Sequence, residues 1–137
     1  MKLACLAATA LLACSTTDDR PQTLAFITES ILAPNCGTAE CHSTKKHQSN
    51  DVFDNVAGAQ ASMATYGLLL CSANGSTLDP CVVDARKTYL YQVIDDKDIE
   101  GDQMPLDQPL ATADLALIVD WINAGADGYT SPTASGN

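Results

Sequence analysis

The stretch CGTAECH, from Cys36 to His42, decides how this chain is interpreted. It holds two thiols, Cys36 and Cys41, and an imidazole, His42, that directly follows the second thiol. Apolar residues at helical spacing precede the stretch, and Pro34 ends that helix, so the stretch is expected to lie in a loop. Two thiols and an imidazole in one loop can hold a cofactor or a metal ion, or can close a local disulfide in an exported protein.

The charge balance excludes whole classes of partner. The chain has 137 residues, of which 7 are Lys or Arg and 17 are Asp or Glu, so its formal charge is -10. Nucleic-acid phosphates and anionic lipid surfaces are bound by clusters of Lys and Arg that this chain lacks. We therefore expect no nucleic-acid partner and no polybasic contact with a membrane.

The first residues predict export as a lipoprotein. Residues 1–13 combine a basic residue, Lys2, with a short apolar core, and the sequence LLAC that ends at Cys14 is typical of a lipoprotein cleavage site. Cys14 would be acylated and become the first mature residue, and the alternative is an ordinary signal peptide with incidental cysteines. We expect an outer-membrane lipoprotein of the cell envelope, periplasmic or surface-exposed, whose lipid is its only attachment to the membrane.

The remaining chain is expected to form one domain. Residues 14–22 are polar and predict a lipidated tether, residues 23–127 the domain, and residues 128–137 a disordered tail. Within the domain the hydrophobic periodicity is helical wherever it is clear.

Signals for helix ends divide the domain into helices. The first helix is expected to be capped by Asp18 or Asp19, and a second to open at Asn50 or Asp51. Thr88 is the expected cap of a third helix.

A fourth helix is the clearest, with Thr112 as its expected cap, Asp114 in its first turn and Gly125 at its end. No segment alternates over enough residues to predict a strand. We therefore expect an all-α domain of four to five helices joined by long loops. Only two Phe and one Trp are available to fill its core, so a large apolar cofactor or a disulfide framework is expected to complete it.

The pattern C-x4-C-H is a widened form of C-x-x-C-H, the signal for covalent haem attachment. Two thiols add to the two vinyl groups on one porphyrin edge, and the histidine beside the second thiol turns under the iron. Gly37 makes it easier for the four residues between the thiols to bulge outward. The alternatives are a local disulfide between Cys36 and Cys41 and a zinc site that adds His42 and His47.

Haem iron needs a second axial ligand on its opposite face. His47 is too close to His42 in the sequence to reach round the ring, and apart from the initiator the chain offers only two methionines, Met63 and Met104. Met63 lies in a helical stripe and is interpreted as core packing. Met104 lies in a loop before Pro105, whose fixed φ can hold the thioether inward, so Met104 is the expected distal ligand.

These features together resemble a monohaem class I cytochrome c of the kind found in exported bacterial lipoproteins. The resemblance rests on Cys41-His42-Ser43, Thr88–Tyr91 (TYLY), Met104-Pro105 and Trp121–Ala126 (WINAGA). It implies a cytochrome c-like fold of helices around one covalent haem c, in which the first helix packs against the last. It also implies thioethers through Cys36 and Cys41 and iron ligation by His42 and Met104.

The expected function is one-electron transfer, with no bond-making chemistry, because two protein ligands leave no open position on the iron. A peroxidase or gas-sensing role would become credible only without Met104 on the iron. The acidic stretch 96–100 and Asp107 predict a rim that attracts redox partner proteins with a basic docking face. The same stretch matches a calcium loop poorly, because Pro105 falls inside it.

Cys71 and Cys81 flank a loop with turn signals at Asn74-Gly75 and Asp79-Pro80. A disulfide that closes this loop is the simple interpretation, and two buried free thiols are the alternative.

A competing function follows from the cysteines alone. It is a haem-free lipoprotein module, stapled by disulfides, that serves binding or adhesion.

Overall fold

The computed structural model describes residues 18–95 and 103–132. The predicted signal peptide, the lipidation site Cys14 and the acidic stretch 96–100 lie outside the described residues. No helix in the described part of the chain is long and apolar enough to pass through a bilayer.

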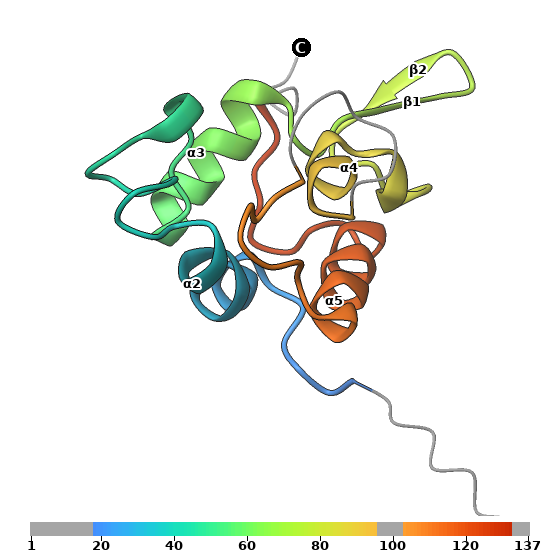
Figure 1. Cartoon of the computed structure of the whole chain (residues 1–137). Coiled ribbons are helices and arrows are strands. Elements are labelled where there is room, and N and C mark those ends of the chain that lie inside the picture. The colour runs from blue at the N-terminus through green and yellow to red at the C-terminus, as the bar shows by residue number, and fades with distance from the viewer. Residues whose placement is uncertain (1–17, 96–102, 133–137) are drawn as a thin grey trace, which may run out of the picture.

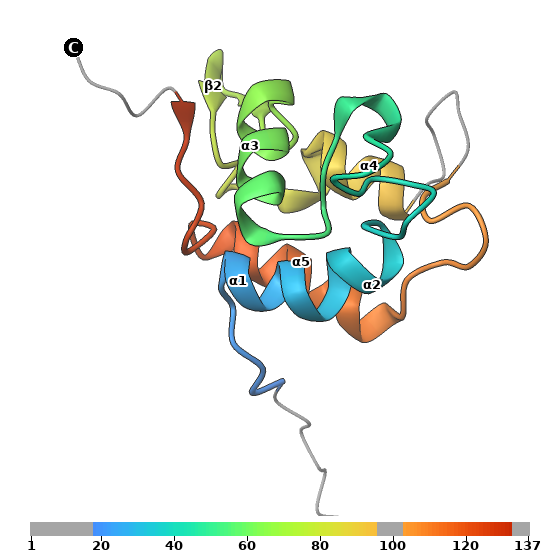
Figure 2. The same ribbon diagram turned by 90° about the vertical axis from the view of Figure 1, so that its left-hand side faces the viewer.

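Short helices and one hairpin make up the described part of the chain (Figure 1). In chain order the elements are α1 (Leu24–Ile27), the π-helical turn η1 (Thr28–Leu32), α2 (Ala33–Asn35), the 3-10 turn η2 (Gln48–Asn50), α3 (Val56–Tyr66), β1 (Cys71–Ala73), β2 (Ser76–Leu78), the 3-10 turn η3 (Ala85–Lys87), α4 (Tyr89–Asp95) and α5 (Thr112–Asn123). In both views the α1–α2 segment and α5 form one layer, and α3 and α4 lie above it (Figures 1 and 2).

The hairpin corrects the expected fold class. Strands β1 and β2 pair antiparallel with Cys71 opposite Leu78, so the domain is a mixed helical fold with a small sheet and is not all-α. The turn between them has a positive φ at both Asn74 (52°) and Gly75 (79°), which suits a two-residue hairpin turn. Strands of three residues are too short to show an alternation of apolar and polar residues. The sequence therefore predicted the turn and did not predict the pairing of the strands.

Two helix starts differ from those expected. Thr23, rather than Asp18 or Asp19, caps α1, and its hydroxyl accepts a hydrogen bond from the Phe26 amide at 3.2 Å. The Asp18 carboxylate instead accepts hydrogen bonds from the guanidinium of Arg20. The cap preference of an acidic residue was therefore outweighed by a stronger charged partner.

The start of α3 also moves. Asn55 caps it by accepting a hydrogen bond from the Gly58 amide at 2.8 Å. The expected caps, Asn50 and Asp51, precede the buried residues Val52 and Phe53, so the chain first runs inward before the helix can begin. Burial of these two side chains decided the position of the helix.

The later helices begin close to the expected positions. Thr88 caps α4 as predicted, because its hydroxyl accepts a hydrogen bond from the Tyr91 amide at 3.2 Å. Ala111 occupies the cap position of α5, and Thr112, the expected cap, is its first residue. Asp114 lies in the first turn of α5, where the helix dipole favours a negative charge.

One apolar core joins the two layers. Its largest fully buried side chains include Leu24, Ile27, Ile31, Leu32, Met63, Leu69, Ile94, Leu117, Ile118, Trp121 and Ile122. The backbone carbonyl of Asp127 joins the first helix to the last, because it accepts hydrogen bonds from the Leu24 amide (2.7 Å) and from Nε1 of Trp121 (3.1 Å). The start of α1 is therefore anchored just beyond the end of α5.

Part of the expected tail belongs to the domain. The hydroxyl of Tyr129 donates to the carboxylate of Asp79 at 2.9 Å, and Ser131 donates to the same carboxylate at 2.7 Å. Thr130 and Gln60 exchange two hydrogen bonds of 2.7 and 2.9 Å. Residues 129–131 are thus held against α3 and the loop that follows β2.

A disulfide joins Cys71 and Cys81, the pair that the sequence indicates, with Cα atoms 5.3 Å apart. We expect the double variant Cys71→Ser/Cys81→Ser to lose about 2 to 3 kcal/mol of unfolding free energy, because its unfolded chain is less restricted. Urea denaturation with and without dithiothreitol checks this. The reductant should destabilise the native protein and leave the variant unchanged, and equal midpoints for the two oxidised proteins would contradict it.

Candidate cofactor site

A cavity of about 550 Å³ lies beside α2, α4 and the segment Met104–Gln108. Cys36, Cys41, His42 and Met104, the four residues predicted to hold a cofactor, all line it. Most of the remaining wall is apolar and consists of Leu32, Pro34, Phe53, Leu68, Leu90, Val93, Ile94, Pro105 and Leu106. A mostly apolar cavity of this size with a few convergent polar groups is typical of a cofactor site.

The backbone brings the two ends of the Cys36–His42 stretch together. The carbonyl of Cys36 accepts a hydrogen bond from the His42 amide at 3.0 Å, which closes the stretch into a compact loop. Ala39 and Glu40 are exposed and are not among the cavity residues, whereas Thr38 is exposed and also lines the cavity. The wide spacing between the thiols is therefore taken up by an outward bulge, and both cysteines remain at the cavity.

Gly37 has a different role from the one expected. It is buried, and a Cβ at this position would lie 2.6 Å from Cα of Asp54. Two stretches of backbone thus approach more closely here than any other residue allows. The absence of a side chain, rather than conformational freedom in the bulge, explains the glycine.

The imidazole of His42 is oriented by two neighbours. Its Nδ1 lies 2.9 Å from the backbone carbonyl oxygen of Gln48, and the ring of Phe53 packs edge-on against it with centroids 5.5 Å apart. A carbonyl oxygen can only accept a hydrogen bond, so Nδ1 carries the proton and Nε2 keeps a free lone pair. Metal-binding histidines usually have this arrangement, in which a hydrogen bond from one ring nitrogen fixes the orientation of the ring and leaves the other nitrogen to bind the metal.

The two thiols of the loop are free, and the local disulfide considered for them is not formed. Cys36 is buried, and this burial, together with the nearby Cys41, raises the pKa of its thiol to about 12. Cys41 is partly exposed. Cys36 therefore stays protonated at neutral pH and is protected from oxidation, because the thiolate is the reactive form.

The two methionines differ in their surroundings. Met104 is half-buried at the cavity, and its amide donates a hydrogen bond to the carbonyl of Val93 at 2.8 Å. Met63 is fully buried in the core on α3 and is not among the cavity residues. Both methionines contact the apolar core, and the structure distinguishes them because Met104 alone of the two also lines the cavity.

The alternative of a zinc site has no support. The described residues contain no group of three or more His, Cys, Asp or Glu side chains that could hold a metal ion. His47 is exposed, and its Nε2 lies 2.6 Å from the backbone oxygen of Thr44.

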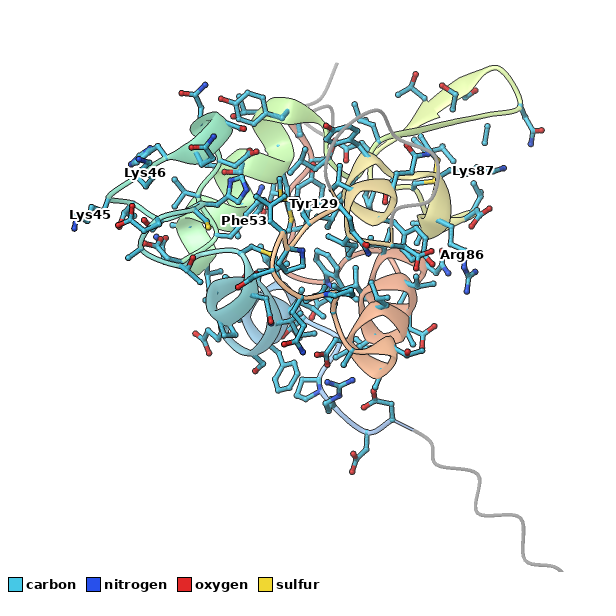
Figure 3. The ribbon with its side chains drawn as sticks, viewed as in Figure 1. Lys45, Lys46, Phe53, Arg86, Lys87 and Tyr129 are labelled. Carbon is cyan, nitrogen blue, oxygen red and sulfur yellow. A yellow bond between two sulfur atoms is a disulfide. The ribbon has the colours of Figure 1, made fainter. Side chains whose placement is uncertain are left out.

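The loop that carries His47 has its lysines on the outside. Figure 3 shows Lys45 and Lys46 at its outer edge, away from the centre of the molecule, whereas Phe53 lies toward the centre.

One cavity residue was missed by the sequence analysis. Asp51 lines the cavity, although its expected role was to cap a helix. Its Oδ1 is buried, and no donor among the described residues reaches this atom. A polar residue between two turns carries no periodic signal, so only the folded chain reveals its position.

Comparison of the chain with protein-family models, with curated protein sequences and with solved structures finds no match.

Proposed function

We propose that this chain holds one c-type haem covalently in the cavity and transfers single electrons in the cell envelope. The observation that carries the proposal is the convergence of Cys36, Cys41, His42 and Met104 on one largely apolar cavity of about 550 Å³. These four residues come from two segments about sixty positions apart. Together they provide the two thiols that covalent attachment of a haem requires and the two side chains that can bind its iron from opposite faces.

The residues present fit such a group. Both thiols are free, so each can form a thioether in which sulfur bonds to one vinyl carbon and hydrogen to the other. His42 presents Nε2 as a neutral ligand, since Nδ1 is engaged by the Gln48 carbonyl at 2.9 Å. Met104 would bind through its thioether from the loop before Pro105. When bound, the haem would supply an iron that alternates between Fe²⁺ and Fe³⁺ by one electron.

The two proposed iron ligands decide whether peroxide or oxygen could react at the iron. His42 and Met104 would take both axial positions, which leaves none for peroxide or oxygen, so an electron-transfer protein is proposed rather than an enzyme. The cavity is accessible from outside along Tyr89 (53% exposed) and Leu106 (66% exposed). The net charge of -10 favours redox partner proteins with a basic docking face. The lipid on Cys14 would keep the domain at the outer membrane.

Expression of the full chain in a bacterial host with a cytochrome c maturation system tests the proposal. The product should be red, keep its haem in a denaturing gel, and show a sharp α-band on reduction. A mass spectrum should show the added mass of haem and of lipid. The double variant Cys36→Ala/Cys41→Ala should lose the covalent haem. A colourless protein with these two cysteines oxidised would contradict the proposal and favour the disulfide-stapled binding module.

A further inference from the structure

The cavity holds a buried acceptor that no protein group satisfies. Oδ1 of Asp51 is shielded from solvent and receives no hydrogen bond from any described residue. Buried polar groups in native proteins are nearly always paired, so an unpaired one in a cofactor cavity points to a role toward the cofactor. Burial raises the pKa of Asp51, and the His42 imidazole, which lines the same cavity, acts in the opposite direction.

The charges around Asp51 are unbalanced. Among the described residues that line the cavity, the carboxylates are Asp51 and Asp107, and neither Lys nor Arg is present. His42 is the basic group there, and it would be neutral as an iron ligand. Lys45 and Lys46 are exposed on the outer edge of the loop (Figure 3). Asp107 is exposed to water, which screens its charge, whereas Asp51 is only partly exposed and its Oδ1 is buried, so its charge is screened less.

We propose that Asp51 lowers the reduction potential of the haem held in this cavity, an inference that rests on the proposed function. A negative charge in a partly buried site stabilises Fe³⁺ more than Fe²⁺, because the interaction grows with the charge of its partner. It opposes the effect of His and Met ligation, which raises the potential. Asp51 exchanges no electron and forms no bond. The single electron comes from an external reductant and goes to the iron.

The test is a redox titration of the full-length, haem-loaded protein with dithionite and ferricyanide at about pH 8, where carboxyl groups are ionised. At the midpoint potential of the native protein, the nearly isosteric variant Asp51→Asn should show a ratio of reduced to oxidised haem that is about tenfold higher. This corresponds to a positive shift of about 59 mV for a one-electron couple. The matched control Asp107→Asn removes an exposed carboxylate from the same cavity and should shift the ratio less than twofold.

Further variants separate charge from shape. Asp51→Glu keeps the charge and should stay within twofold of the native ratio, and Asp51→Ser provides a second neutral side chain should Asp51→Asn fail to fold. An unchanged potential in the neutral variant, or an equal shift in Asp107→Asn, would overturn the inference while the proposed function stands. A native protein without haem would instead overturn the proposed function itself.

Discussion

A His42→Ala variant, expressed with the same maturation system, will contain at least tenfold less haem with a sharp reduced α-band than the native protein. The reason is the loss of the one cavity imidazole, whose Nε2 lone pair is left free by the hydrogen bond of 2.9 Å from Nδ1 to Gln48. Absorption spectra per mole of protein provide the measurement. Added imidazole should partly restore the spectrum, because it replaces the missing ligand in a cavity that is otherwise intact.

His47→Ala is the matched control for this change. His47 follows five positions later, is exposed, and is not among the cavity residues. Its haem content should equal that of the native protein. A normal spectrum in His42→Ala, or the same loss in both variants, would remove His42 from the role of axial ligand.

Met104→Ala is expected to lower the reduction potential by on the order of 0.1 V, part of the range of about 0.8 V that axial ligands span. In the proposed haem site, loss of the thioether would remove the ligand that favours Fe²⁺ and would open one position on the iron. Carbon monoxide should therefore bind the reduced variant and leave the native protein unchanged. Peroxidase activity should rise in the same variant. The redox titration and the carbon monoxide difference spectrum check these expectations.

Met63→Ala should show the opposite pattern. Its side chain is fully buried in the core on α3, so the substitution leaves a void and should cost about 2 to 5 kcal/mol of unfolding free energy. Its potential and its lack of carbon monoxide binding should match those of the native protein. If Met63→Ala opened the iron and Met104→Ala did not, the assignment of the distal ligand would be wrong.

The candidate cofactor residues could be proposed from the sequence because their chemistry is unusual. Few loops combine two thiols with an adjacent imidazole, and Met104 stands before Pro105 in a polar stretch, outside any helical apolar stripe. Thr88 could be recognised as a cap because a Thr hydroxyl competes with backbone hydrogen bonds inside a helix, whereas at the helix start it accepts from an amide that has no partner within the helix. Asp51 could not be recognised, since its oxygen becomes unpaired only when the chain folds over it.

The sequence by itself determined which groups are available: the thiols and imidazole of Cys36–His42, Met104, two further cysteines that flank a turn-rich loop, and the acidic charge. These follow from local chemistry and spacing. The tertiary structure decided which of these groups lie close together. It alone paired the three-residue strands, moved the start of α3 to Val56 and brought Met104 to the same cavity as Cys36. Such outcomes depend on burial against residues distant in the chain, and no local pattern records that burial.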